Sequence, residues 1–486
     1  MLFNSYIFIL LFLPVSVIGY FICGKSARYE LPKLWLLGMS VWFYAYLHVG
    51  YALLLTGSIL VNYLIVQWMG KQKSNASRKF FLLLGIAFNI GVLFYYKYCN
   101  FFIENINSIF DSDLSLLKLL LPVGISFITF QQISCQVDCY KGEAQKYSFL
   151  EYALYIAFFP KISSGPIMLF RDFLPQIQNR ENEKVNYDNI ARGFYLFAMG
   201  LAKKVLIADT FAKLVTIGFA DVGALHTVSA LGIMLCYSLQ LYFDFSGYSD
   251  MAIGVARMFN IKLPVNFASP YKARSVSDFW KRWHITLTHF FTKYVYIPLG
   301  GNRKGRARTC INVMIVFLLS GLWHGANWTF VVWGGMHGLI LALERITDHK
   351  IEKVPFVGRA FTFLFVNAAW VVFRSDSLSD AGLFFSRIFV PGHGAVESAL
   401  LDAMNSLVEL RVLSRLGFGT LTDSIPALPL VLFILGSLFM VFVTKNTQER
   451  VEKFCYNRKQ RMFAVALLFW SIISLSSVNV FLYSNF

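Results

Sequence analysis

Two histidines lie in an apolar stretch of the sequence. The segment SGLWHGANWTFVVWGGMHG, residues 320–338, places His324 and His337 among tryptophans, glycines and aliphatic side chains. An imidazole exchanges a proton near neutral pH and can also carry an acyl group, so His324 suits general-base or nucleophilic catalysis. Ionisable groups at membrane depth are rare and usually functional, which favours a site role for His324 over a plain interhelical hydrogen bond. For His337, which continues a helical pattern, packing is the preferred interpretation.

A second candidate cluster lies between residues 277 and 305. His284 follows Trp283 in SDFWKRWHITL, and the turn LGGNRKG comes next. Backbone N–H groups and cations in such a segment can hold the phosphates of a donor molecule. The candidate donor-binding residues are Lys281, Arg282, Asn302 and Arg303. The alternative is that the cations and the rings of Trp280 and Trp283 only anchor the chain at a membrane interface.

The third cluster, LQLYFDFSGYSDMAIG, residues 239–254, contains two carboxylates in an otherwise apolar segment. Asp244 and Asp250 would each cost ~2.5 kcal/mol or more if exposed to lipid. We therefore expect them to pair with cations or to line an aqueous cavity, and structural pairing is favoured over direct catalysis. Tyr242 and Ser246 lie between or beside them and are assigned supporting roles.

Apolar segments must position these clusters. Hydrophobic residues make up 57% of the 486 residues and charged residues only 15%, against ~25% in a soluble domain. The composition indicates an all-α, multispanning membrane protein with about eleven transmembrane helices, folded as one domain over residues 1–486. The apolar runs include Leu2–Cys23, Leu34–Met69, Phe80–Tyr96, Leu116–Ile133, Ala360–Phe373, Leu428–Val443 and Met462–Phe481. The seven cysteines suggest neither a disulfide framework nor a metal site.

The net charge of +17 is distributed as the positive-inside rule requires, so a nucleic-acid partner is not expected. Segments 24–33, 71–79 and 271–308 are basic and should face the cytoplasm. Residues Leu34–Met69 contain no charge and should form a helical hairpin, whereas the acidic segment Lys97–Asp113 is expected to be an outward loop. This alternation places both chain termini outside the cytoplasm.

Two segments are too short to span a bilayer. Tyr152–Phe159 ends at Pro160 and suggests a re-entrant element around an internal chamber. Ile311–Trp323 would rise only ~20 Å as a helix, less than a ~30 Å hydrocarbon core, so residues 324–327 are predicted to turn inside the membrane.

The motifs resemble the membrane-bound O-acyltransferases, in the branch that includes alginate and peptidoglycan O-acetyltransferases. The likeness covers nearly the whole chain and is carried in order by LPVGISF, LYFDFSGYSDMAIG, FWKRWHITL, YIPLGGNRKG, GLWHGANWTFVVWGGMHG and the terminal FLYSNF. It implies helices around a funnel or tunnel, with His324 as the catalytic histidine, His284 as the second histidine, and Trp323 and Asn327 as supporting residues. Where relatives commonly have histidine in the motif Phe-Pro-His, this chain has Lys161.

The resemblance also implies the reaction. An acyl group, expected to be acetyl, passes from a cytoplasmic thioester to an extracytoplasmic polysaccharide such as alginate or peptidoglycan. The donor is acetyl-CoA or an acyl carrier protein, and no tightly bound cofactor or metal is expected. A partner protein outside the bacterial inner membrane takes part, and we expect the C-terminal segment Asn479–Phe486 to lie at an outer interface where it would dock.

Two other functions explain the intramembrane charges. A proton-coupled transporter or flippase would use histidines and aspartates as a relay, although the sequence shows no inverted repeat. A non-catalytic scaffold would use the histidines only as hydrogen-bond partners. Release of the acyl group from a thioester distinguishes the enzyme from both alternatives.

Overall fold

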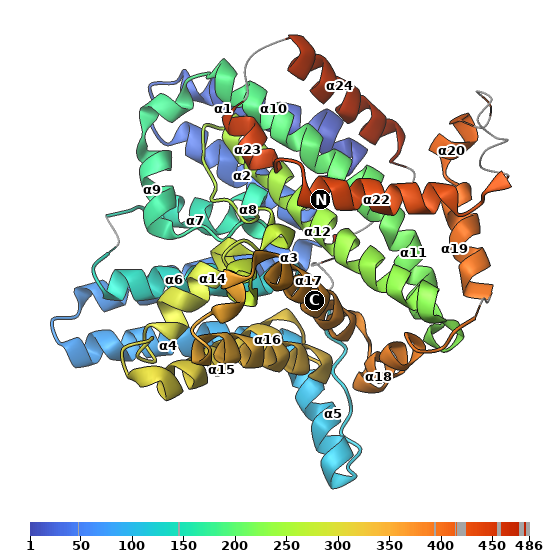
Figure 1. Ribbon diagram of the computed structural model, residues 1–486. Coiled ribbons are helices and arrows are strands. Elements are labelled where there is room, and N and C mark those ends of the chain that lie inside the picture. Colours follow the sequence, from blue (N-terminus) through green and yellow to red (C-terminus); the bar gives the residue numbers. More distant parts are fainter. Residues whose placement is uncertain are drawn as a thin grey trace.

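Helices make up the described chain, and no strand occurs among the residues that the structure describes (Figure 1). The computed structural model describes residues 1–46, 48–143, 146–392, 395–413, 415, 424–453, 458–475 and 481–482. Within these, five helices are long and apolar enough to cross a membrane, and two shorter helices are also apolar. The long ones are Val49–Lys71, Asn75–Phe110, Thr227–Met258, Gly305–His324 and Pro355–Arg374. The predicted all-α polytopic class is confirmed, while the total of about eleven spans stays a prediction.

The helices follow the chain in one continuous series, interrupted by short π-helical turns. They are α1 (Leu13–Gly24), α2 (Leu31–Ala45), α3 (Val49–Lys71), α4 (Asn75–Leu93), α5 (Cys99–Phe110), α6 (Ile125–Tyr140), α7 (Phe149–Ala157), α8 (Phe159–Ile162), α9 (Phe170–Gln178), α10 (Tyr187–Ala202), α11 (Asp209–Ala220), α12 (Thr227–Met258), α13 (Val276–Trp280), α14 (Ile285–Phe291), α15 (Gly305–His324), α16 (Trp328–Ile346), α17 (Pro355–Arg374), α18 (Leu378–Arg387), α19 (Ala395–Asn405), α20 (Val408–Leu413), α22 (Leu428–Phe442), α23 (Thr447–Glu452) and α24 (Arg458–Ile473).

The longest helix, α12, forms the centre of the molecule. Every residue from Cys236 to Ala256 on it is buried, including the two aspartates of the third cluster. α10, α11 and the π-helical turn η4 (Lys203–Ala208) pack along one side of it, and α17 packs on another. A helix buried on all sides need not be amphipathic, which explains why its sequence shows no polar stripe.

Three sequence predictions about helix boundaries have clear outcomes. The charge-free run Leu34–Met69 is a helical hairpin, α2 and α3, as expected. The predicted outward loop Lys97–Asp113 is wrong, because the chain stays helical to Phe110. The run Leu116–Ile133 is also not one helix: α6 begins only at Ile125, after Gly124 adopts a left-handed conformation with φ 75°. The short run 152–159 lies in α7 and α8 and is buried inside the protein.

α15 and α16 form the hairpin that carries the first histidine cluster. α15 starts at Gly305, six residues before the apolar run, and its 20 residues rise about 30 Å. The expected short helix is therefore wrong, because the helix includes the basic first turn, whose long side chains reach water while their stems stay in the helix. The connecting turn runs from Gly325 to Asn327, and the Asn327 side chain caps α16 by accepting a hydrogen bond from the Thr329 N–H (3.0 Å).

Glycines let the two helices of this hairpin approach closely. A Cβ atom on Gly334 would collide with the backbone carbonyl of Phe317 on α15, whereas a Cβ on the neighbouring Gly335 would meet only the end of Leu318 at 3.8 Å. Small residues at such contacts are the usual basis of close helix packing in membranes.

The glycine pair yields a matched test of this packing. We expect Gly334→Ala to destabilise the protein by about 1–3 kcal/mol, because the added methyl group forces α15 and α16 apart. Gly335→Ala should leave the thermal midpoint in detergent nearly unchanged. Equal midpoints for the two variants would show that the close contact does not hold the hairpin together.

Candidate active site

His324 is the last residue of α15 and is buried against aromatic rings. Its ring centroid lies 4.9 Å from that of Trp323, 5.1 Å from Trp333 and 5.3 Å from Phe373. These rings come from α15, α16 and α17, so three helices fix the orientation of the imidazole. Because only 2% of the residue is exposed, the ring is shielded from bulk water.

Lys97 holds the helix end that carries His324. Its Nζ donates hydrogen bonds to the carbonyl oxygens of Trp323 (2.6 Å) and His324 (3.1 Å) and to Ser126 Oγ (3.4 Å). The last carbonyls of a helix lack intrahelical donors, and a cation at this position satisfies them. The Tyr98 hydroxyl donates to the preceding carbonyl, that of Leu322 (2.8 Å). Both residues project from the π-helical turn η2 (Phe94–Tyr98), a type of irregularity that is frequent at functional sites.

His284 lies in the interior behind the same tryptophan. It precedes α14 in a left-handed conformation with φ 44°, and its Nδ1 lies 3.1 Å from Asn266 Oδ1. The Trp323 ring lies 6.1 Å from the His284 ring and 4.9 Å from the His324 ring, so it connects the two predicted histidines. Backbone strain of this kind in a non-glycine residue is typical of functional sites.

A small cavity opens beside His324. It has a volume of about 20 Å³ and is lined by Lys97, Ser126, Ser163, Trp323 and His324 among others. This space holds roughly one water molecule, so an acyl group needs the surrounding side chains to move. Ser163 is also hydrogen-bonded to the Tyr248 hydroxyl of α12.

Two larger cavities lie near the histidine pair. One, of about 590 Å³, is lined by the α15–α16 turn at Asn327, by Phe330, and by Phe373, whose ring contacts His324. The other, of about 500 Å³, is lined by Thr286. Thr286 Oγ1 donates to the same Asn266 oxygen that His284 contacts (2.9 Å). Each histidine is therefore linked to one cavity through a neighbouring side chain.

The 500 Å³ cavity is rich in cations. Lys293 forms ion pairs with Asp138 and Glu143 (both 2.8 Å), and a hydrogen bond from Lys293 together with the nearby Arg171 lowers the pKa of Glu143. By contrast, Lys262 and His289 line the cavity as exposed side chains that form no ion pair within the described chain. Lys262 is therefore a cation available to a ligand, and the His289 imidazole can offer a hydrogen bond.

The carboxylates of α12 form ion pairs. Asp244 lies 2.7 Å from Lys204, which also contacts Asp209 (2.9 Å), and Asp250 lies 2.7 Å from Lys203. The sequence favours structural pairing of these aspartates, and the structure identifies their lysine partners. The consecutive lysines in GLAKKVLIA, in a run that is otherwise apolar, are the signal that could have revealed them.

The remaining supporting residues are also buried. Tyr242 packs its ring on Trp283 (6.4 Å) and Phe267 (6.0 Å), and Ser246 lies one turn further along α12. Trp280 and Trp283, considered above as possible interface anchors, are only 5% and 1% exposed. The interface assignment is therefore wrong for both, because α13 and the following turn fold into the core.

The four proposed donor residues lie in two turns of the chain. Arg282 pairs with Asp278 (2.8 Å) across one helical turn, and Lys281 is exposed. Asn302 and Arg303 are exposed in the turn before α15, where Gly300 and Gly301 have positive φ. Within the described chain, no hydrogen bond or ion pair joins the first two residues to the last two.

His337 and Lys161 are buried, and each is hydrogen-bonded to another side chain. The Trp280 indole N–H donates to His337 Nδ1 (3.1 Å), which fits the packing role expected of this histidine. Lys161, which replaces the histidine common in the resembling family, is fully buried. It donates a hydrogen bond to Gln131 and lies over the Tyr155 ring (4.2 Å).

Only part of the C-terminal segment can be compared with its prediction, because residues 476–480 and 483–486 lie outside the described residues. Phe481 is buried, with its ring 4.5 Å from Tyr248 and 5.5 Å from Phe245. The Leu482 N–H donates to Asp244 Oδ2 (2.9 Å). Phe481 therefore lies in the interior and not in an interfacial belt, whereas the half-buried Leu482 lines the 590 Å³ cavity. The expected position of the tail at an outer interface stays a prediction.

The long apolar helices and the two buried histidines, one of which lines a small cavity, fit an integral-membrane enzyme. The model of the MBOAT, membrane-bound O-acyltransferase family matches residues 36–374, and the chain belongs to this family. The chain is 43% identical to the peptidoglycan O-acetyltransferase of Helicobacter pylori over 412 residues, 78% of each chain. It is 40% identical to the probable alginate O-acetylase AlgI of Pseudomonas putida over 399 residues, 80% of each chain.

The chain is also similar to a more distant transferase. The chain is 28% identical to the teichoic acid D-alanyltransferase of Streptococcus thermophilus over 253 residues, half of this chain and 60% of that protein. The resemblance inferred from the motifs is confirmed, and the protein is a membrane O-acyltransferase.

Proposed function

We propose that the protein transfers an acetyl group from a cytoplasmic thioester, acetyl-CoA or an acyl carrier protein, to an extracytoplasmic polysaccharide. The observation that carries this proposal is the buried pair of His284 and His324, which the Trp323 ring connects. Phe373 links His324 to one cavity, and the contacts of Asn266 link His284 to the other. The relatives named peptidoglycan O-acetyltransferase and alginate O-acetylase support an acetyl donor and a glycan acceptor.

The donor enters through the 500 Å³ cavity at Thr286. Positive charge favours the phosphates or acidic surface of a thioester carrier, and Lys262 supplies a cation that forms no ion pair within the described chain. The cavity lies beside the basic segment 271–308, which the positive-inside rule places in the cytoplasm of a bacterial inner-membrane protein, with both chain termini outside.

The acceptor side is the 590 Å³ cavity at Asn327 and Phe373. In the transfer, the thioester C–S bond breaks and an ester C–O bond forms, while the acceptor proton passes to the thiolate that leaves. His324 either takes that proton as a general base, or carries the acyl group covalently after the C–S bond breaks and before the C–O bond forms. A partner protein outside the membrane receives the acyl group at this cavity and passes it to the polysaccharide.

The purified protein tests this function directly. Supplied with a labelled acetyl thioester in detergent, it should release the acyl group and free thiol in equal amounts. A transporter or a scaffold would leave the thioester intact. Absence of cleavage by folded protein, with both thioester types, would refute the proposed reaction.

The cations at the donor cavity yield a kinetic test. We expect Lys262→Gln to raise the donor KM several-fold with a smaller change in kcat, because the lysine contributes binding that is equal in the ground and transition states. The combined neutralisation of Lys281, Arg282 and Arg303 tests the sequence-based donor site in the same assay. A larger KM increase in that triple variant than in Lys262→Gln would place the donor at the α13 and α15 turns instead.

A further inference from the structure

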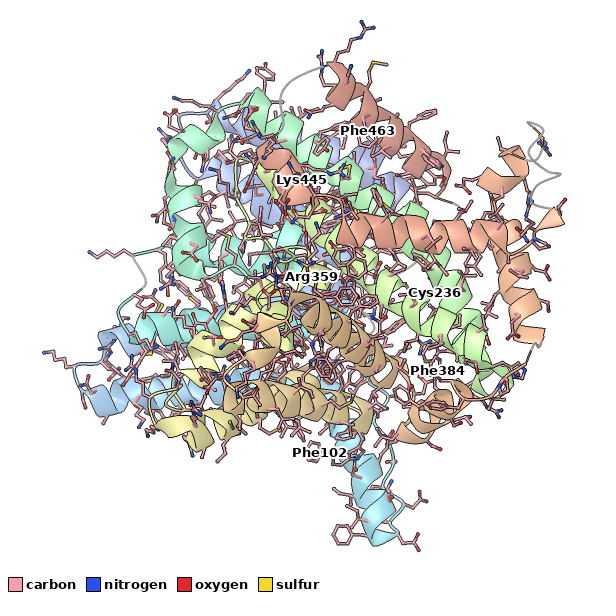
Figure 2. The ribbon with its side chains drawn as sticks, viewed as in Figure 1. Phe102, Cys236, Arg359, Phe384, Lys445 and Phe463 are labelled. Atoms are coloured by element: carbon pink, nitrogen blue, oxygen red, sulfur yellow. The ribbon has the colours of Figure 1, made fainter. Side chains whose placement is uncertain are left out.

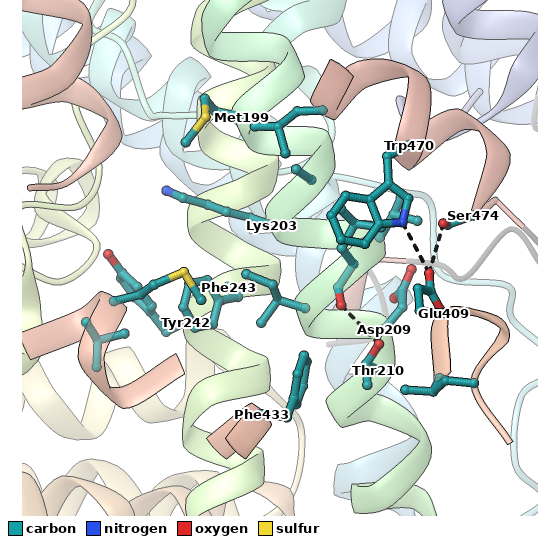
Figure 3. Close-up of a pocket in the computed structure, with 18 of the residues that line it drawn as sticks. Met199, Lys203, Asp209, Thr210, Tyr242, Phe243, Glu409, Phe433, Trp470 and Ser474 are labelled. Carbon is teal, nitrogen blue, oxygen red and sulfur yellow. Dashed lines mark hydrogen bonds between the residues drawn. The ribbon is translucent and has the colours of Figure 1, made fainter. Parts of the chain in front are cut away.

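A further cavity has neither His284 nor His324 in its lining. It has a volume of about 600 Å³ and runs between the α10–α11–α12 group and the C-terminal helices α22 and α24 (Figure 3). That volume is within the ~300–1,000 Å³ typical of ligand sites, which are mostly apolar with a few polar groups. Neither catalytic cavity nor any proposed acyl-transfer step uses this space.

The middle of this cavity is apolar. Met199 on α10, Phe243 on α12 and Phe433 on α22 line it, and Leu467 on α24 closes the opposite wall. Figure 3 shows Met199, Phe243 and Phe433 directed into the space from separate helices. This apolar part, called the slot below, has walls from four helices and suits a hydrocarbon chain.

The polar residues that line the cavity fall into two groups. In the first group, Glu409 Oε1 accepts hydrogen bonds from the Trp470 indole (3.3 Å) and the Ser474 hydroxyl (3.1 Å), which joins α20 to α24 (Figure 3). The Glu409 carboxylate is therefore held by residues of α24. It offers no positive charge to a ligand.

The second group of polar lining residues includes two cations, Lys445 and Arg450. Lys445 follows α22, and Arg450 lies on α23, with its Nε donating to the Lys445 carbonyl (3.1 Å). Neither side chain forms an ion pair with a carboxylate in the described part of the chain. The nearby Lys203 is neutralised by Asp250, and Glu449 accepts a hydrogen bond from Asn446. Figure 2 shows Lys445 near the junction of α22 and α23, with Phe463 further out on α24.

We propose that this cavity binds one anionic phospholipid, with an acyl chain in the slot and its phosphate at Lys445 and Arg450. Cationic side chains near a membrane surface attract anionic headgroups. The apolar slot accommodates one acyl chain of the bound lipid. The bound lipid fills the space between α22, α24 and the core. It also supports Tyr242, which lines the cavity and packs on Trp283 beside His284.

Lipid retained by the purified protein tests this proposal. After extensive washing in non-ionic detergent, the wild-type protein should retain about one anionic phospholipid per chain, measured by extraction and mass spectrometry. Lys445→Gln with Arg450→Gln should retain at least tenfold less. Lys459→Gln, an exposed cation on α24 outside the cavity, is the matched control and should retain as much as wild type.

A second variant separates the slot from the charges. Leu467→Trp fills the apolar part, so it should lose the lipid although both cations remain. Added phosphatidylglycerol should raise the thermal midpoint of delipidated wild type, whereas phosphatidylcholine and inorganic phosphate should not. Equal retention in the charge variant and wild type would overturn the proposal, and so would stabilisation by inorganic phosphate equal to that by the lipid.

Discussion

Replacing His324 by glutamine should abolish O-acylation while the protein still folds. The imidazole is the group placed to move a proton or an acyl group between the two cavities, and general-base catalysis contributes ~10²–10⁴ in rate. We expect acyl transfer to fall by at least about a hundredfold, with protein levels and thermal midpoint close to wild type. Glycan acylation in cells and thioester cleavage by purified protein are the two measurements.

His337→Gln is the matched control for this loss. His337 is as buried as His324 and lies on the adjacent helix of the same hairpin, but its Nδ1 only accepts the Trp280 hydrogen bond. We expect this variant to be less stable and to keep most of its activity per folded molecule. Similar losses of activity in both variants, at equal folded protein, would mean that the hairpin needs histidines for structure.

Replacing Lys97 by methionine should have the second largest effect. The substitution removes the donor to the Trp323 and His324 carbonyls, and each buried carbonyl left without a partner costs about 1–3 kcal/mol. The end of α15 then shifts, and a displacement near 1 Å of a catalytic group can cost about a hundredfold in rate. We expect kcat to fall by about that factor with little change in the donor KM.

The exposed Lys118 offers a control for the Lys97 variant. Lys118→Met, in the segment after α5, also removes one positive charge but no described hydrogen bond, so kcat and thermal midpoint should stay unchanged. If Lys97→Met lowered the thermal midpoint while kcat stayed at the wild-type value, Lys97 would support the fold without positioning His324.

Much of the fold was predictable because apolar length and charge distribution are local properties. The uncharged run of α2 and α3 and the tight turn after His324 follow directly from residue types. The boundaries at Gly305 and Ile125 do not. A basic first turn can be helical when its long side chains reach water. The exposed apolar run before Ile125 is extended, and the Asn100 side chain on α5 accepts from the Leu117 N–H (2.8 Å) and donates to the Leu117 carbonyl (2.9 Å).

Residues of the candidate site could be predicted only where an ionisable side chain lies in an apolar segment, because such groups are rare at membrane depth and are usually functional or paired. His324, His284 and the α12 aspartates satisfy this condition. Lys97, Asn266 and Lys204 do not, because their importance depends on which distant segment they contact: Lys97 reaches a carbonyl 227 residues later in the chain. A sequence pattern on one helix contains no information about such a partner.

The position of the histidines between donor and acceptor sides is most directly tested in membrane vesicles of known orientation. Inverted and right-side-out vesicles containing the protein would receive a membrane-impermeant acetyl thioester, and release of free thiol would be measured. The proposed site predicts cleavage in inverted vesicles, little in right-side-out vesicles, and none in either with His324→Gln. Equal cleavage in both orientations, or undiminished cleavage by the His324→Gln protein, would contradict it.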